Sequence, residues 1–143
     1  MGPPGVGASG VPAQAEPVAD GAVARIALLC PDLLFGSKIE GALTIAGHSI
    51  SRFDSEERVR VGASFHDLLV VDLNEEKFDA PALIASMREQ GQLDAVPTLG
   101  FYGHLDQDTR HRAEEAGFNR VVPRSRMARE TADLVEKLLP PNA

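Results

Sequence analysis

The sequence predicts an α/β protein with an open, doubly wound parallel sheet, and three features of the chain lead to this prediction. Short apolar segments recur along the chain, and segments with the 3.6-residue periodicity of an amphipathic helix separate them. Most of the apolar segments lack polar alternation, which is typical of strands covered by helices on both faces. The connecting loops are short, so consecutive strands are expected to run parallel through helical crossovers.

The composition is that of a single soluble domain, because 43% of the 143 residues are hydrophobic and 24% are charged. A net charge of -7 would repel a phosphate backbone, so nucleic acid is not an expected partner. No apolar run approaches the ~20 residues that a membrane-spanning helix needs. The single cysteine, Cys30, argues against disulfides and cysteine-based metal sites. We therefore expect a cytoplasmic protein with no membrane attachment.

The two ends of the chain differ from the part between them. Residues 1–22 are rich in Gly, Pro, Ala and Val and would gain too little by burial to offset the entropy of ordering them. We expect them to form a disordered leader. The prolines of the tail 140–143 cannot continue a helix. One folded domain is therefore expected to span residues 23–139.

Five segments have the composition of β-strands, and one of them alternates polar and apolar residues as an edge strand would. In chain order, the predicted strands are 24–30, 48–53 (the alternating one), 68–73, 98–102 and 120–122. The predicted helices that follow them are 37–47, 54–63, 79–91, 106–117 and 125–139.

Capping signals predict where these helices start. Ser37 is followed by Glu40 at the spacing of a capping box, and Asp54 with Glu57 repeats that spacing at the next helix. Asp79 precedes a first turn that contains proline, as N-cap residues often do. Glycines at 47, 91 and 117 are typical stop signals for three of the helices.

This alternation predicts a flavodoxin-like sheet with strand order 2-1-3-4-5. In such a sheet, ligands bind beyond the carboxyl ends of the strands, near the point where the strand order reverses. We therefore expect the residues that follow the strands to gather in one cluster. The candidates are Cys30, Pro31 and Asp32 after the first strand, Asp72, Asn74 and Glu75 after the third, Tyr102, Gly103, His104 and Asp106 after the fourth, and Pro123, Arg124 and Ser125 after the fifth.

Three stretches of the chain resemble one protein family. The strand that ends in Val-Val-Asp at Asp72, the stretch PTLGFY and the stretch AGFNRVVPRS are similar to receiver domains of two-component response regulators. The resemblance covers roughly residues 25–139. It implies a stand-alone, receiver-like signalling module without enzymatic activity, in which Asp72 is the phosphoacceptor candidate.

The resemblance also implies a magnesium site that this chain has altered. Two acids after the first strand help to hold Mg²⁺ in the family, and the matching positions here are Cys30 and Pro31. Asp32 could serve as a metal ligand with Asp72, or it could cap the next helix. Phosphoryl transfer to a carboxylate needs a divalent ion to neutralise the charges that it brings together. We therefore expect phosphorylation at Asp72 to be vestigial or altered.

Three more positions depart from the family pattern. The hydroxyl residue that ends the fourth strand becomes Tyr102, the lysine after the fifth strand becomes Arg124, and the proline that usually follows becomes Ser125. We expect Ser125 to cap the last helix. Arg124 could form an ion pair with Asp72, or it could hold a phosphate or a partner's carboxylate.

His104 and Asp106 leave two interpretations open. A histidine oriented by a nearby carboxylate could act as a general base. Asp106 would equally well cap the following helix, which makes the pair structural. The alternative function is therefore a small-anion or nucleotide binder, or a hydrolase, that uses His104, Asp106 and Arg124.

A basic strip is predicted on the face formed by the fourth helix, the fifth strand and the fifth helix. Its members are Arg110, Arg112, Arg120, Arg126 and Arg129. On an acidic domain, such a strip could dock a protein partner, which the resemblance suggests is a histidine kinase or a downstream effector. The same residues could instead form a merely solvated face. The chain is expected to be a monomer or a weak homodimer.

Overall fold

The computed structural model describes residues 23–103 and 107–140. The predicted leader 1–22, the candidate residues His104 and Asp106, and all but the first residue of the tail 140–143 lie outside the described residues.

Five parallel strands form one sheet in the order β2-β1-β3-β4-β5, which confirms the predicted topology. The strands are β1 (Arg25–Leu29), β2 (Ser49–Phe53), β3 (Leu68–Asp72), β4 (Thr98–Tyr102) and β5 (Arg120–Pro123). All five residues of β3 and of β4 are buried, whereas none of β2 is, as expected for central and edge strands.

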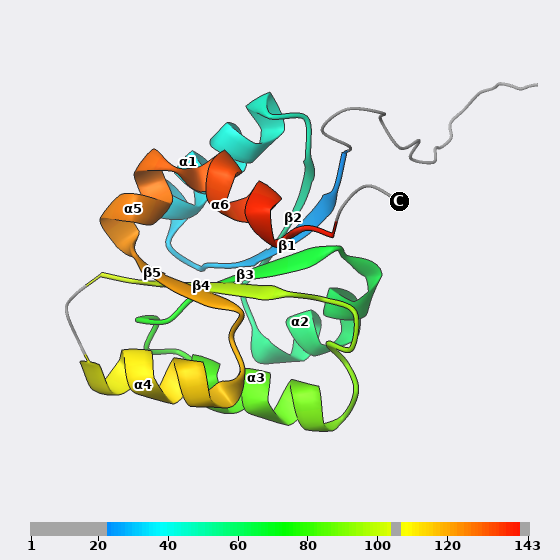
Figure 1. Cartoon of the computed structure of the whole chain (residues 1–143), viewed down its shortest axis with the longest axis vertical. Coiled ribbons are helices and arrows are strands. Elements are labelled where there is room, and N and C mark those ends of the chain that lie inside the picture. Colours follow the sequence, from blue (N-terminus) through cyan, green and yellow to red (C-terminus); the bar gives the residue numbers. More distant parts are fainter. Residues whose placement is uncertain (1–22, 104–106, 141–143) are drawn as a thin grey trace, which may run out of the picture.

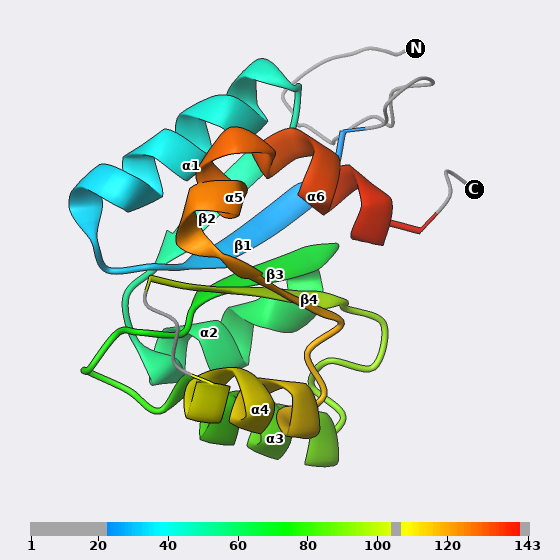
Figure 2. The same ribbon diagram turned by 60° about the vertical axis from the view of Figure 1, so that its left-hand side comes forward.

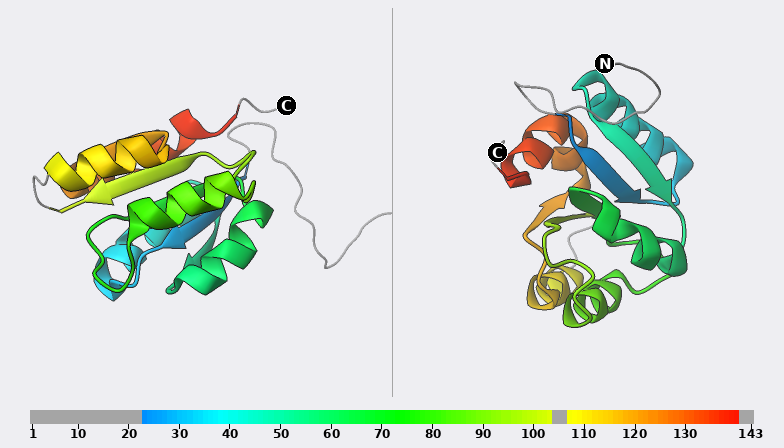
Figure 3. Two further views of the ribbon diagram at one scale, coloured as in Figure 1. Left: turned by 90° about the horizontal axis from the view of Figure 1, so that it is seen from below. Right: turned by 90° about the vertical axis from the view of Figure 1, so that its right-hand side faces the viewer.

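Helices cover both faces of the sheet. One face carries α1 (Leu33–Ile45), α5 (Arg124–Arg129) and α6 (Thr131–Leu138), and the other carries α2 (Glu56–Gly62), α3 (Ala80–Glu89) and α4 (Gln107–Ala116), as Figure 1 and Figure 2 show. A short 3₁₀ helix, η2 (Ala63–Phe65), extends α2. Seen from below in Figure 3, α2, α3 and α4 cover one face of the sheet. Two apolar cores result, one on each side of the strands.

The first helix begins four residues earlier than the sequence predicts. Asp32 is its N-cap and accepts a hydrogen bond from the Phe35 backbone N–H at 3.0 Å, so the capping box expected at Ser37 was wrong. Leu33 and Leu34 are apolar, but they are 76% and 86% exposed. The apolar residues of the first turn therefore do not mark the buried face of α1, and the periodic pattern does not reveal this turn.

Two other predicted caps were also wrong, and one was confirmed. Ser55, not Asp54, caps α2 by accepting the Arg58 N–H, and the last helix starts at Arg124 without any side-chain cap, so Ser125 lies inside it. Asp79 caps α3 as predicted, because its carboxylate accepts the Ala82 N–H. The stop signals at the glycines are confirmed, since all three adopt positive φ angles.

The predicted last helix is divided into α5 and α6 at Glu130, whose φ of -122° and ψ of 32° are not helical. Met127 before this break and Leu134 after it are both buried. Their spacing of seven residues suits one continuous helix, so the periodicity gave no sign of the break.

The structure contains no helix in residues 23–103 and 107–140 that is long and apolar enough to cross a membrane.

Candidate functional site

Asp72 ends the central strand β3 and is the most buried carboxylate at the carboxyl edge of the sheet, with 5% of its surface exposed. Its Oδ1 accepts a hydrogen bond from the Asn74 backbone N–H at 2.9 Å. Burial raises the pKa of Asp72 above its usual range, although the Asn74 N–H and the guanidinium of Arg124 act in the opposite direction. The site therefore penalises the ionised form of Asp72.

Asp32 lies beside Asp72 at the beginning of α1 and is held at both carboxylate oxygens. Oδ1 accepts the Phe35 N–H, and Oδ2 accepts from Arg124 Nη2 at 3.2 Å. The Phe35 hydrogen bond, followed by the charge of Arg124, holds the pKa of Asp32 below its usual range. Asp32 thus serves as the helix cap that we had considered, and it is also an acceptor for Arg124.

Arg124 connects the two carboxylates. Its Nη2 lies 3.2 Å from Asp32 Oδ2 and 3.9 Å from Asp72 Oδ2, so the ion pair with Asp72, one of the two roles considered for Arg124, is present in the structure. The guanidinium also lies over the Phe35 ring, with 4.3 Å between Cζ and the ring centroid. Arg124 therefore supplies a fixed positive charge between two negative ones, over an aromatic surface.

Cys30 completes the cluster from the end of β1. Its Sγ lies 3.9 Å from Asp72 Oδ2 and 3.8 Å from the carbonyl oxygen of Asp32. Burial, together with the charge of Asp72, raises the pKa of the Cys30 thiol to about 12. The thiol therefore stays protonated at neutral pH and acts as a weak donor, not as a nucleophile.

The donor set around Arg124 does not fit Mg²⁺. This ion is usually held in octahedral geometry by one or two carboxylates together with several waters, and a cation already paired with those carboxylates competes with it. The cluster offers two carboxylates and a protonated thiol, and the Arg124 guanidinium already lies within 4 Å of both acids. In residues 23–103 and 107–140, no group of three or more His, Cys, Asp or Glu side chains could hold a metal ion.

Two of the remaining predicted site residues, Tyr102 and Ser125, lie apart from this cluster. Tyr102 is 6% exposed and belongs to the core beneath α3 and α4, while Ser125 is exposed on α5. Gly103 follows β4, and its N–H donates to Asn74 Oδ1, which connects the loops after β3 and β4. His104 and Asp106 lie outside the described residues, so their relation to Arg124 stays a prediction.

Two residues of the cluster, Phe35 and Arg52, were not predicted from the sequence. Phe35 supports Arg124 with its ring, and Arg52 of β2 donates from Nη2 to the Cys30 carbonyl oxygen at 3.2 Å. Candidates were chosen among the residues that directly follow a strand at the carboxyl edge of the sheet, and neither Phe35 nor Arg52 is such a residue. The available signal was an arginine inside the predicted edge strand.

The predicted basic strip is largely neutralised by acids. In Figure 2, α4 and α5 flank β5 from opposite faces of the sheet. Four of the five arginines of the strip form ion pairs: Arg110 with Glu114, Arg112 with Asp79, and Arg126 and Arg129 with Glu130. This surface is therefore a charged mixture and not a continuous basic patch.

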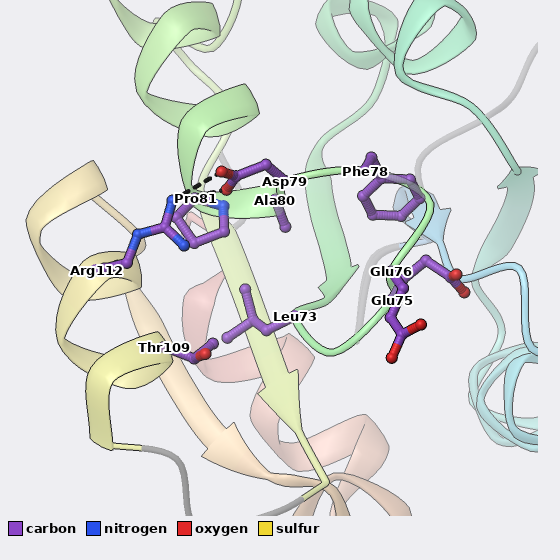
Figure 4. Close-up of a pocket in the computed structure, with 9 residues that line it drawn as sticks. All are labelled: Leu73, Glu75, Glu76, Phe78, Asp79, Ala80, Pro81, Thr109 and Arg112. Atoms are coloured by element: carbon purple, nitrogen blue, oxygen red, sulfur yellow. Dashed lines mark hydrogen bonds and ion pairs between the residues drawn. The ribbon is translucent and has the colours of Figure 1, made fainter.

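An open pocket of about 350 Å³ lies between α4 and the loop that joins β3 to α3, as Figure 4 shows. Its lining residues are Leu73, Glu75, Glu76, Phe78, Asp79, Ala80, Pro81, Thr109 and Arg112. Arg112 donates to both carboxylate oxygens of Asp79 at 2.8 and 2.9 Å. The lining combines two further acids, Glu75 and Glu76, with the Arg112–Asp79 ion pair, and this mixture selects no single class of ligand.

No family model matches the sequence, and no curated protein matches it. The structure is similar to the signal receiver domain of the response regulator NarL from Mycobacterium tuberculosis, with a TM-score of 0.69 and 17% identity over 80% of this chain and 94% of that one. The chain has the receiver-domain fold.

Two other solved structures share this receiver fold. The phosphorylated cyanobacterial phytochrome response regulator RcpA gives a TM-score of 0.71 at 16% identity, over 85% of this chain and 98% of that one. The chemotaxis response regulator CheY4 of Vibrio cholerae gives a TM-score of 0.71 at 13% identity, over 82% of this chain and 99% of that one. At these identities the likeness establishes the receiver fold, whereas the chemistry at Asp72 has to be argued from the site itself.

Proposed function

We propose that this chain is a stand-alone signalling module that acts by docking to a protein partner, without enzymatic activity and with phosphorylation at Asp72 vestigial. The response regulators that share its fold are signalling proteins, which supports the general assignment. The position of Arg124, between Asp32 and Asp72, carries the specific part of the proposal.

The electrostatics of the cluster explain why phosphorylation would be weak. A phosphoryl group on Asp72 would add about 1.5 to 2 negative charges beside Asp32. A divalent ion normally offsets such charge, but Arg124 provides a single positive charge that two acids already share. Burial further disfavours an additional unpaired anion at this depth.

Phosphorylation can be tested directly by mass. The protein is incubated with acetyl phosphate and Mg²⁺, and its intact mass is followed with time. We expect no stable gain of a phosphoryl group in the native chain, and Asp72→Asn serves as the matched control. A phosphoryl group that forms on the native chain and is absent from Asp72→Asn would restore the ordinary receiver mechanism and contradict the vestigial assignment.

The face around β5 is our proposed docking surface. Arg120 lies on this edge strand and has no ion pair among the described residues, whereas the other arginines of the strip are paired. With a histidine kinase or effector that binds the native chain, Arg120→Ala should weaken binding. Arg25→Ala, at the start of β1, is the matched control and should leave binding unchanged. Equal affinities for both variants would place the docking surface elsewhere.

A further inference from the structure

The loop that carries Cys30 and Asp32 is held from its far side by Arg52 of the edge strand β2. Arg52 Nη2 lies 3.2 Å from the Cys30 carbonyl oxygen and 3.5 Å from the Asp32 carbonyl oxygen. Its Nη1 lies 3.3 Å from Glu40 Oε1, on α1. One side chain thus connects the end of β1, the cap of α1 and a later turn of α1.

Arg52 reaches these carbonyls only because residue 36 is glycine. A Cβ at Gly36 would lie 2.2 Å from Arg52 Nη2 and 2.7 Å from Cζ, which is closer than atoms can approach. Gly36 is buried inside α1 and has no positive φ, so its backbone geometry does not require glycine. Glycine in a helix interior is destabilising, and here it leaves room for the guanidinium.

The placement of Arg52 is costly in a second way. Its Nε is buried and has no hydrogen-bond partner among the described residues. An apolar side chain would fill the same space at this edge without the free-energy cost of a partly unsatisfied charged group. What the arginine gains is a pair of carbonyl contacts beside the cluster, including the carbonyl of Asp32, which also accepts the Gly36 N–H.

Two arginines therefore hold Asp32 from opposite sides. Arg52 lies in β2 and Arg124 follows β5, the two edge strands of the sheet. Arg124 donates to the Asp32 carboxylate, and Arg52 donates to the Asp32 carbonyl oxygen. We propose that Arg52 is a positioning residue, which with Gly36 fixes the loop so that Asp32 presents one oxygen to Phe35 and the other to Arg124. This inference deepens the proposed function and rests on the Arg124 cluster on which that function is based.

Amide hydrogen exchange of the native chain gives a local measure of this role. The Phe35 N–H donates to Asp32 Oδ1, so its exchange reports how well the loop is held. The Ala82 N–H makes the same kind of N-cap bond to Asp79 Oδ1 on the opposite face of the sheet, and it serves as the internal control. Arg52→Met removes the donors and keeps the aliphatic stem. We expect it to accelerate exchange of the Phe35 amide by about tenfold and to leave the Ala82 amide unchanged.

Gly36→Ala tests the same contact without altering Arg52. The added methyl group should expel the guanidinium and reproduce the selective effect on Phe35. Gly41→Ala is the matched control, because it lies in the same helix and its Cβ would meet no atom within 4 Å. We expect Gly41→Ala to leave the Phe35 amide as protected as in the native chain.

Two results would overturn the inference. Equal acceleration of the Phe35 and Ala82 amides in Arg52→Met would reveal a general loss of stability, and an unchanged Phe35 amide would show that Arg52 does not hold the loop. If Arg52→Met does not fold, the comparison between Gly36→Ala and Gly41→Ala decides. The exchange readout is independent of phosphorylation, so a phosphorylated Asp72 would contradict the proposed function and leave this inference intact.

Discussion

Arg124 and Asp32 are 92 residues apart in the chain, and their side chains meet at 3.2 Å. The contact lies next to Asp72 and over Phe35, at the carboxyl edge of the sheet. It places a permanent positive charge within 4 Å of both carboxylates at this edge of the sheet. Two further groups of the cluster, Asp72 and Cys30, adjoin this pair.

Removal of the Arg124 charge should destabilise the fold moderately. Arg124→Met leaves the buried Asp72 and the cap Asp32 without their shared cation. Because both side chains of the Arg124–Asp32 pair remain more than a third exposed, we expect a loss of only about 1 kcal/mol in the free energy of unfolding at neutral pH. Urea denaturation measures this change.

Arg126→Met is the matched control for that experiment. Arg126 lies on the same short helix and makes an i,i+4 pair with Glu130, which is worth about 0.3 to 0.5 kcal/mol. If both variants lost the same stability, the Arg124 contact would be an ordinary surface ion pair and would not define a site.

Neutralising Asp72 should stabilise the protein at neutral pH. A pKa raised by burial means that the folded state holds the Asp72 proton more tightly than the unfolded chain does. Stability from this group is therefore lost as pH rises from the unfolded pKa, about 3.9, through the folded pKa. Asp72→Asn should raise the free energy of unfolding at pH 7, and the gain should disappear below the unfolded pKa. A gain that persists at low pH would indicate better packing instead of a relieved charge.

The Cys30 thiol should resist alkylation until the protein unfolds. With a pKa of about 12, only about one thiol in ten thousand is ionised at pH 8. Iodoacetamide should therefore react slowly with native protein and at the ordinary thiol rate in urea. Asp72→Asn should speed the native reaction, because the Asp72 charge is the second cause of the raised pKa. Asp67→Asn, remote from the thiol and paired with Arg25, is the control and should change nothing.

Small anions should not stabilise the protein. An anion site at this edge would need Arg124, which two carboxylates already engage. A ligand present at a hundred times its dissociation constant would add about 2.7 kcal/mol of stability. We expect phosphate and nucleotides to leave the melting temperature unchanged. A rise with any of them would favour the alternative function, in which His104 and Asp106 take part.

Local signals accounted for the predictions that were confirmed. Asp79 caps its helix because an Asp-X-Pro start is read within a few residues, and β3 forms because its apolar run suits a strand covered on both faces. The start of α1 was predicted wrongly because the corresponding local signal is absent there. Its first turn exposes Leu33 and Leu34 to solvent and hides a glycine, so the periodic pattern began only at the next turn.

The sequence by itself determined the alternation of strands and helices, the strand order and the placement of Asp72 at the end of the central strand. The alternation follows from hydrophobic periodicity and turn chemistry, which act over a few residues, and the strand order follows from the topology rules that govern such alternating chains. Only the tertiary structure decided that Arg124 lies between Asp32 and Asp72 and that Arg52 fits beneath Gly36. Such contacts join elements far apart in the chain, and they depend on helix placement and side-chain direction, which no local pattern encodes.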